Sequence, residues 1–440
     1  MKFIFVILFI FLHPALFYGQ DGFQYYSPKD KITIPFKLIN NLIFIPLKVN
    51  GVNVNFLLDS GVQETILFSL DEDKSIALQN VERIKFAGFG HSEYVEGLRS
   101  SGNAVEVGGM LKDFNHEIYI ILDEDFNISS SVGIPVNGII GYHFFKNFPV
   151  EINYLKKKIV IYKADRLKPN RVKKFNKYKL SIENNKPYLL TDFAIDSLTH
   201  NAKLLLDTGN SDALWLFQNR IGKMNQEVVI QNDYLGRGFS GEIYGDRVKL
   251  KHFKIDCFTF KNSYAAIPDT VSIRNLHLVD KRIGSIGSEL LKRFTTVFDY
   301  KNQQLYLKKN SYFNNSFTYN SSGLDVHHKG LQWIQERVSL KSSTSNRSES
   351  KVNANSSDYL YKFELKPVFI ISSVRKDSPA YNSGLRKDDI LIMINGRMAH
   401  NLSLQQINDI FRSDKERKIV LEIERNNRRM KFTFYLKGNI

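Results

Sequence analysis

The sequence contains a single cysteine, Cys257, so no disulfide can form within the chain. Animal extracellular enzymes usually carry such bridges, and their absence is more typical of a bacterial periplasmic protein. Cys257 lies in an apolar stretch, so we expect it to be a small core residue rather than a nucleophile. His-x-x-x-His, Cys-x-x-Cys and P-loop spacings are also absent, so we expect no metal site and no cofactor.

An uncharged apolar run, Phe3–Leu12, follows Lys2 at the N-terminus, and the small residue Gly19 comes soon after it. The run is short for a transmembrane span and has the layout of a secretory signal. We therefore expect residues 1–19 to be a signal peptide, cleaved near Gln20, with export to the periplasm or exterior of a bacterium. An uncleaved membrane anchor is the alternative. No cysteine lies near the cleavage site, so we expect no lipid attachment there.

The charge balance is strongly basic, with a net charge of +16. Two segments are dense in Lys and Arg, Lys156–Lys179 and Arg412–Lys431. Neither has the interleaved stacking aromatics or the motif of a nucleic-acid module, so we expect no nucleic-acid partner. Solvated faces and a linker are the favoured interpretation, and weak attraction to an anionic membrane surface stays open.

One short string occurs twice: Phe56-Leu57-Leu58-Asp59-Ser60-Gly61 and Leu204-Leu205-Leu206-Asp207-Thr208-Gly209. Each apolar run predicts a buried strand, and each Gly allows a tight turn after the Asp. A carboxylate at the end of a buried strand is costly unless it is hydrogen-bonded or shared. Both copies therefore place an acidic group where it needs a partner.

The spacing shows that these two strings belong to a larger duplication. The two Asp residues are 148 positions apart, and three glycine pairs have the same offset. The later echoes are 146 positions apart, which indicates one small net deletion between the copies. Such self-similarity indicates two copies of a unit of roughly 120 residues, about one lobe each. The paired features are Gly88 with Gly236, Gly90 with Gly238, Gly97 with Gly245, Gly138–Gly141 with Gly284–Gly287, and Tyr154 with Tyr300.

Over residues 30–310 the chain resembles the retropepsin-like aspartic proteases, which have one Asp-Thr/Ser-Gly per lobe. Ile139-Ile140-Gly141 fits the family's hydrophobic-hydrophobic-Gly motif, whereas Ser285 replaces the first apolar residue of the second copy. Ser60 and Val62 also depart from the more usual Thr and small residue. The resemblance implies a mostly β, two-lobed, pseudo-twofold β-barrel fold.

The resemblance also implies a catalytic pair, Asp59 and Asp207, that shares a proton and activates water to cleave a polypeptide substrate. Ser60 and Thr208 would hydrogen-bond around the pair, and Gly61 and Gly209 would offer backbone N–H groups to it. A mobile β-hairpin flap closes over the substrate in this family. The flap candidates are Gly88, Gly90, Tyr94, Gly236, Gly238 and Tyr244.

The last part of the chain reads as a separate α+β unit. Ser378-Pro379 predicts a capped helix start, Asn395-Gly396 a hairpin turn, and Ser403 the cap of an amphipathic helix. With Gly384-Leu385 and Asp389-Ile390-Leu391 between them, these residues resemble the PDZ domains of bacterial proteases, which have a partly open β-barrel. The resemblance implies a C-terminal peptide ligand, although a closed, purely structural PDZ is an equal alternative. The groove candidates are Lys366, Val368, Phe369, Ile370, Ile407 and Phe411.

Ser342–Ser357 is rich in Ser and Asn and has no apolar period, which predicts a flexible loop. Residues 323–338 carry enough apolar side chains to add a strand to a neighbouring domain. The expected divisions are the signal 1–19, the first lobe 30–160, a basic linker 161–187, the second lobe 188–310, a linker 311–362 and the PDZ domain 363–437. The start of the PDZ domain stays open, with a strand from 323–338 as a possible addition to it.

Three interpretations remain open. The preferred one is a secreted or periplasmic aspartic endopeptidase, expected to be a monomer. The others are a protease-like protein that binds peptides without cutting them, and a PDZ-scaffolded envelope protein whose lobes are only structural. An Asp in both copies favours the first, because a degenerate enzyme would be expected to lose at least one.

Overall fold

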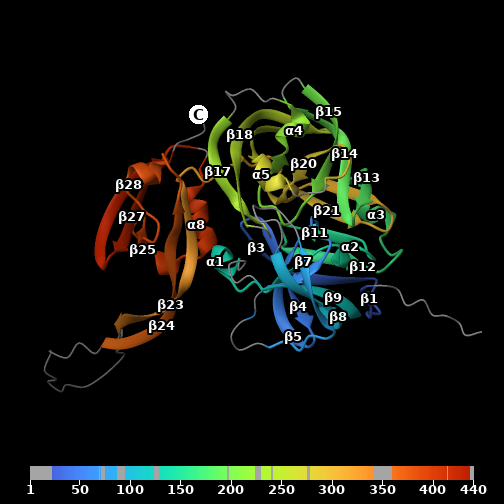
Figure 1. Ribbon diagram of the computed structural model, residues 1–440, viewed down its shortest axis with the longest axis horizontal. Helices are drawn as coiled ribbons and strands as arrows, with labels where there is room; N and C mark the ends of the chain where they lie inside the picture. The colour runs from blue at the N-terminus through green and yellow to red at the C-terminus, as the bar shows by residue number, and fades with distance from the viewer. Residues whose placement is uncertain are drawn as a thin grey trace, which may run out of the picture.

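The computed structural model describes residues 22–68, 70, 75–86, 95–122, 128–195, 198–222, 229–238, 241–274, 278–339, 359–413 and 415–436. The expected signal peptide, the Ser- and Asn-rich loop, and the flap candidates Gly88, Gly90 and Tyr94 lie outside these residues. Figure 1 shows two β-rich lobes, blue to teal and green to yellow, with an orange and red C-terminal unit beside them. No helix in the described part of the chain is long and apolar enough to cross a bilayer.

The first lobe is built on one sheet, in which each strand is hydrogen-bonded to the next in a continuous order. In order, the path runs β1 (Gln24–Tyr25), β9 (Leu111–Ile121), β6 (Thr65–Leu67), β10 (Gly138–Ile140), β5 (Val52–Leu58), β4 (Leu42–Val49), β8 (Val95–Val107) and β7 (Val81–Phe86), with β3 (Lys37–Ile39) against β4.

The second lobe repeats this path and then continues into a sheet shared by both lobes. In order, the strands are β17 (Val229–Gly238), β18 (Gly241–Ile255), β19 (Phe258–Pro268), β16 (Leu214–Leu216), β20 (Arg282–Ile286), β15 (Leu198–Leu206), β14 (Lys186–Ile195), β13 (Asn176–Glu183), β22 (Gln304–Lys309), β21 (Phe294–Asp299), β11 (Val150–Asn153), β12 (Lys158–Tyr162) and β2 (Lys31–Pro35).

The duplication in the sequence is therefore a duplication of topology. In the first lobe β10 pairs parallel with β5 and antiparallel with β6, and β6 pairs parallel with β9. In the second lobe β20, β15, β16 and β19 have the same relations. The expected mostly β, two-lobed arrangement is confirmed.

The two lobes are joined by backbone pairing between β11 and β21, in which Val150 lies opposite Phe298. The expected basic linker contributes to this shared sheet, because β13 pairs with both β22 and β14. Its short helix α3 (Pro169–Val172) places Arg171 against the buried carboxylate of Glu151, with Nε to Oε2 at 2.9 Å. This part of the connector is thus ordered structure rather than a free tether.

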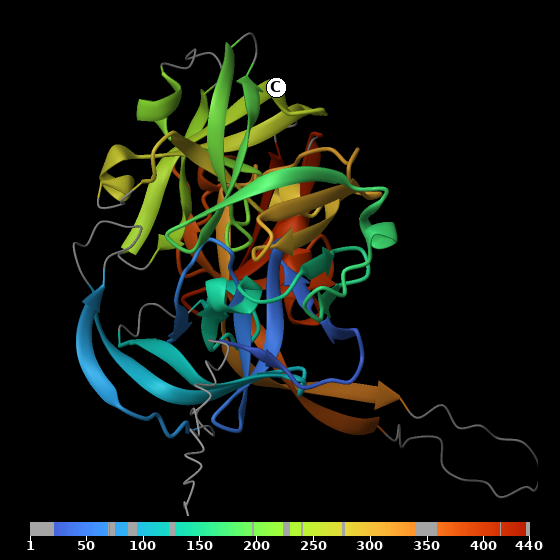
Figure 2. The same cartoon turned by 90° about the vertical axis from the view of Figure 1, so that its right-hand side faces the viewer.

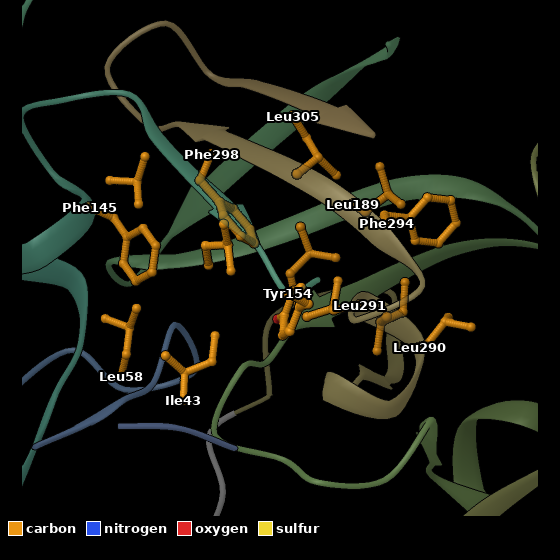
Figure 3. Packing of buried hydrophobic residues seen from close by; sticks show 14 of the residues in the cluster. Ile43, Leu58, Phe145, Tyr154, Leu189, Leu290, Leu291, Phe294, Phe298 and Leu305 are labelled. Atoms are coloured by element: carbon orange, nitrogen blue, oxygen red, sulfur yellow. The ribbon is translucent and has the colours of Figure 1, made fainter. Parts of the chain in front are cut away.

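A continuous apolar core runs across this junction (Figure 3). The ring of Phe145 stacks on Tyr300 at 5.3 Å between centroids and meets Phe298 edge-on at 5.4 Å. Leu58 from the first lobe and Leu189 from the second pack into the same cluster. The short helices around the lobes are α1 (Ser129–Val132), α2 (Tyr142–Phe145), α4 (Gln218–Ile221), α5 (Thr270–Ile273) and α6 (Ser288–Leu291).

The C-terminal unit has its own core and its own sheet. Ser378 caps its first helix, and Ser403 forms a capping box with Gln406 on its second. The elements are β23 (Leu324–Ser339), β24 (Tyr359–Val374), α7 (Pro379–Asn382), β25 (Ile390–Ile394), β26 (Arg397–Met398), the 3-10 helix η3 (Ala399–Asn401), α8 (Leu404–Phe411), β27 (Arg417–Arg425) and β28 (Arg428–Leu436).

The environment of Cys257 differs from the expectation of a core residue. It is exposed, because it lies in the two-residue turn between β18 and β19 where Asp256 adopts a positive φ of 48°. The flanking apolar residues Ile255 and Phe258 are buried, so the stretch looked like core in the sequence. The turn itself carries its side chains outward.

Replacing Phe298 by Ala should lower the free energy of unfolding by about 3–5 kcal/mol, because it empties a fully buried site between the lobes. Urea denaturation followed by circular dichroism measures this. Leu155→Ala, at a turn residue that is 43% exposed, is the matched control and should change stability by less than about 0.5 kcal/mol. Equal effects of the two substitutions would contradict this account of the core.

Candidate active site

Asp59 and Asp207 each follow the last residue of a central strand, β5 and β15. The Asp59 amide donates to the Ile140 carbonyl at 3.0 Å, and the Asp207 amide donates to the Ile286 carbonyl at 2.9 Å. The two loops are therefore anchored in the same way to the strand that runs parallel beside them. Gly141 makes this close packing possible in the first lobe, since a Cβ there would lie 2.0 Å from the Val62 carbonyl oxygen.

Reciprocal hydrogen bonds tie the two loops together across the lobe boundary. The Ser60 amide donates to Thr208 Oγ1 at 2.9 Å, and the Thr208 amide donates to Ser60 Oγ at 3.0 Å. Each hydroxyl then donates to a carbonyl of the opposite strand, Ser60 to Leu206 at 2.7 Å and Thr208 to Leu58 at 2.8 Å. Both side chains are fully buried, so all four bonds are shielded from water.

Each glycine of the pair lies against the carboxyl group of the other lobe. A Cβ on Gly209 would be 2.1 Å from Asp59 Oδ2, and a Cβ on Gly61 would be 2.9 Å from Asp207 Oδ1. The Gly61 amide donates to Asp59 Oδ1 at 2.7 Å, and the Gly209 amide donates to Asp207 Oδ1 at 3.1 Å. The structure thus brings the two acids and their expected supporting residues into one site.

Burial raises the pKa of both carboxyl groups above its usual range, and most strongly that of Asp59. The charge of Asp207 raises the pKa of Asp59 further. The nearby guanidinium of Arg282 acts in the opposite direction on Asp207 and draws its pKa back down. Burial therefore favours a proton on the pair, and Arg282 favours the charged form of Asp207.

Arg282 is a buried cation that the sequence did not single out. Its Nη2 donates to Ser285 Oγ at 3.1 Å, and its guanidinium lies 5.2 Å from the centroid of the Phe217 ring. Ser285 is the residue that departs from the hydrophobic-hydrophobic-Gly motif, and this hydrogen bond gives the departure a physical reason. The polar Ser285 in an otherwise apolar motif was the available signal in the sequence, but it did not identify Arg282 as its partner.

The acids face an open cleft of about 1840 Å³ that extends over both lobes and the C-terminal unit. The second-lobe flap candidates Gly236, Gly238 and Tyr244 line it, on the β17–β18 hairpin. The Tyr244 hydroxyl donates to Glu242 Oε2 at 2.8 Å, and this bond together with burial raises the pKa of Tyr244 to about 12. This hairpin forms one wall of the cleft.

A chain of partly buried ion pairs connects the C-terminal unit to this hairpin. Arg375 Nη1 lies 3.2 Å from Asp233 Oδ1 on β17, and Arg247 Nε lies 3.1 Å from Asp233 Oδ2. Arg247 Nη1 also lies 3.0 Å from Asp212 Oδ1, whose other oxygen accepts from Trp215 Nε1 at 2.9 Å. The series runs from the C-terminal unit to the loop that follows the second Asp-Thr-Gly.

The turn between β3 and β4 holds the three units at one point. Both of its residues have positive φ, 49° at Asn40 and 68° at Asn41. The Asn40 amide donates to the side chain of Gln405 on α8, and Asn408 Nδ2 donates to Asn40 Oδ1 at 3.2 Å. Asn41 Nδ2 donates to the Ser211 carbonyl of the second lobe at 2.9 Å.

The first lobe also packs directly on α8 through the segment around α1. A Cβ on Gly133 would lie 3.0 Å from Leu404 Cβ, so the two backbones approach closely here. Figure 1 shows α1 between the first lobe and the C-terminal unit. The cleft therefore has a third wall made by the C-terminal unit.

The expected peptide groove on β24 does not agree with the strand pairing. Phe369 pairs with His328 of β23 on one side and with Leu391 of β25 on the other, so no free backbone edge remains there. Ile370 is enclosed in the same way, and Lys366 and Val368 pair with β23. Ile407 and Phe411 are fully buried in the unit's core.

The outer strand is instead β23, which comes before the Ser- and Asn-rich segment. It begins after Gly323, whose φ is +81°, in the sequence Ser322-Gly323-Leu324. Gly323 and Leu324 line the same cleft as the two acids. Gly323, just before β23, was the sequence signal for the loop at the start of this strand. The expected span of the C-terminal unit began only at residue 363, so β23 lay outside it.

A buried network in the first lobe has the connectivity of a hydrolase triad without access to substrate. Thr65 Oγ1 lies 2.7 Å from His116 Nε2, and His116 Nδ1 lies 2.7 Å from Asp113 Oδ2. Burial alone would raise the pKa of Asp113, but the hydrogen bond and charge of His116 outweigh burial, so the pKa lies below its usual value. Thr65 and His116 are sealed in the core and do not line the cleft, so the network is structural.

No cluster of three or more His, Cys, Asp or Glu residues suited to a metal ion occurs among the described residues. At the cleft, backbone amides of Gly61 and Gly209 hold the two carboxyl groups.

Residues 370–425 match the family model of the PDZ domain, so the C-terminal unit is a PDZ domain. Two solved structures are similar to the chain over part of its length. An aspartic proteinase from Irpex lacteus is 13% identical with a TM-score of 0.42, covering 65% of this chain and 99% of its own. Basic 7S globulin from soybean is 11% identical with a TM-score of 0.38, covering 66% and 98%. No curated protein matches the sequence.

Removing either bridging hydroxyl should destabilise the fold. Ser60→Ala or Thr208→Ala leaves a buried amide and a buried carbonyl unpaired, which should cost about 1–3 kcal/mol each in urea unfolding. The double variant should lose less than the sum, because both residues hold the same two loops together. Thr208→Ser keeps the hydroxyl and is the control. Strict additivity would show that the two bridges act independently.

Asp59→Asn should stabilise the protein at neutral pH. Because the folded state raises the pKa of Asp59, its contribution to stability is full below the unfolded pKa of about 4 and is lost as pH rises through the folded value. The neutral Asn does not lose it, so the variant's advantage over wild type should be larger at pH 7 than at pH 4. Asp192→Asn, at an exposed carboxylate, is the control in the same urea titrations. A less stable Asp59→Asn variant at pH 7 would contradict this account.

Proposed function

We propose that the chain is an aspartic endopeptidase that hydrolyses peptide bonds with a water molecule held between Asp59 and Asp207. The observation that carries this proposal is the meeting of two duplicated Asp-Ser/Thr-Gly loops at one point in an open cleft. A pair of buried carboxyl groups that share a proton provides an acid and a base at once.

The surroundings of the pair suggest which acid has which role. Arg282 favours the charged form of Asp207, so this carboxylate would take a proton from the attacking water. Asp59 would donate its proton to the oxygen of the scissile carbonyl as the C–O bond to water forms. The proton on Asp207 would then pass to the leaving nitrogen as the C–N bond breaks. As the carbonyl re-forms, a hydroxyl of the gem-diol would return a proton to Asp59, which regenerates the starting pair. The Gly61 and Gly209 amides hold both carboxyl groups in place throughout.

The shape of the cleft supports an extended polypeptide as substrate. Its walls come from both lobes and the PDZ domain, and a strand-like chain could lie along the β17–β18 hairpin. PDZ domains take up extended peptides, so this one would hold part of the substrate or set the width of the cleft. We place the enzyme outside the cytoplasm of a bacterium, on the basis of residues 1–19.

A second function is peptide capture without cleavage. The observation that favours it is the PDZ domain as a wall of the same cleft, since a binding protein would need that wall as much as an enzyme would. The two functions differ in whether the acids are needed.

Incubating the purified chain with casein or a peptide library between pH 4 and pH 7 should release cleaved peptides, resolved by mass spectrometry. Asp59→Asn and Asp207→Asn should each lower the rate at least about 100-fold, because each removes one proton-transfer group. Asp192→Asn should retain the wild-type rate. If wild type and both site variants are equally inert, the endopeptidase proposal fails, and peptide binding by the inert chain would then support capture.

A further inference from the structure

The outer half of the β23–β24 hairpin projects from the PDZ domain as an arm, made of residues 331–339 and 359–367. Its strands pair with each other, whereas β25 joins β24 only at Phe369 and Ile370. Both views show the arm reaching beyond the lobes (Figures 1 and 2). The register shifts at its base between His328 and Gly330, where Gly330 has a φ of +129°.

One face of the arm is apolar and open to solvent. Trp333 lies opposite Leu365, and residues two apart on a strand share a face, so Leu331 and Phe363 lie on that side too. Their exposed fractions are 59% for Leu331, 69% for Trp333, 60% for Phe363 and 48% for Leu365. The opposite face carries Gln332, Ile334, Glu364 and Lys366, and the last two form an ion pair of 2.5 Å.

The proposed enzyme chemistry does not account for this face. None of its four apolar residues lines the cleft. A two-stranded ribbon has little stability of its own in water, and a contiguous exposed apolar patch usually marks an interaction surface. Something that covers the face would stabilise the arm.

Two partners could cover this apolar face, a second copy of the chain or a lipid surface, and the charge of the chain distinguishes between them. The arm residues 331–339 and 359–367 contain three Lys or Arg and two Glu, a net charge of +1, and the whole chain carries +16. A second copy would bring the same positive charge to the interface and be repelled. An anionic lipid surface would attract both the arm and the chain. Trp and Phe are residue types that favour the boundary between lipid headgroups and acyl chains.

We propose that the arm lays its apolar face on an anionic lipid surface, with Trp333 and Phe363 inserted at the level of the headgroups. The lipid would be recognised by negative headgroup charge and by an accessible acyl boundary. This binding is separate from peptide cleavage and would hold whether or not the acids are catalytic.

Tryptophan fluorescence tests the proposal directly, because the chain has two tryptophans and only Trp333 is exposed, with Trp215 at 8%. Adding vesicles of phosphatidylcholine with about a third phosphatidylglycerol should shift the emission to shorter wavelength. Sedimentation with the same vesicles should carry the chain down, and high salt or pure phosphatidylcholine should weaken this.

The double variant Trp333→Ser, Phe363→Ser should bind these vesicles at least about tenfold more weakly, because two large apolar side chains are lost from the contact. Leu155→Ser, Leu190→Ser is the matched control, since these residues are 43% and 49% exposed on the lobes, and it should bind like wild type. Circular dichroism and melting temperature establish that both variants fold.

Three results would overturn the proposal: unchanged binding by the folded arm variant, an unshifted emission spectrum, or equal binding to pure phosphatidylcholine at any salt concentration. Analytical ultracentrifugation identifies the main alternative. A dimer that the arm substitutions abolish, in a chain that does not bind vesicles, would show that the face is covered by a second copy.

Discussion

The structure depends on the exchange of hydrogen bonds between Ser60 and Thr208 across the lobe boundary. Each hydroxyl accepts from the other loop's amide and donates to a carbonyl of the other lobe, so both of these buried groups are hydrogen-bonded across the boundary. This exchange fixes the separation of the two loops. The carboxyl groups beside them then have no room to move apart, since each is packed against the opposite glycine.

That confinement gives the site its electrostatic character. Two equal carboxyl groups taken out of water would share one proton, and the pair would be symmetric. Arg282 breaks the symmetry because it lies on the second-lobe side alone, held by Ser285 and the Phe217 ring. A duplicated scaffold thus carries an unequal pair, and the inequality comes from a residue outside the repeated string.

The sequence predicted well what local chemistry determines and poorly what distant contacts determine. The doubled Asp-Ser/Thr-Gly strings, the Asn-Gly turns and the Ser378 and Ser403 caps depend on neighbouring residues, and their patterns could be recognised. The outer PDZ strand could be placed within residues 323–338 only as one option, because the long Ser- and Asn-rich segment separates β23 from β24. The contacts of Arg375 with Asp233 and of Thr65 with His116 join residues whose proximity no local pattern reveals.

The turn at Asn40 and Asn41 has a consequence for how this architecture could change over time. One residue bonds to the PDZ domain and the next to the second lobe, while both belong to the first. Exchange of the PDZ domain for another domain would therefore require matching changes in the first lobe. The C-terminal unit is an integrated part of the body of the molecule, and insertion or recombination at its boundary would be constrained by geometry fixed nearly three hundred residues earlier.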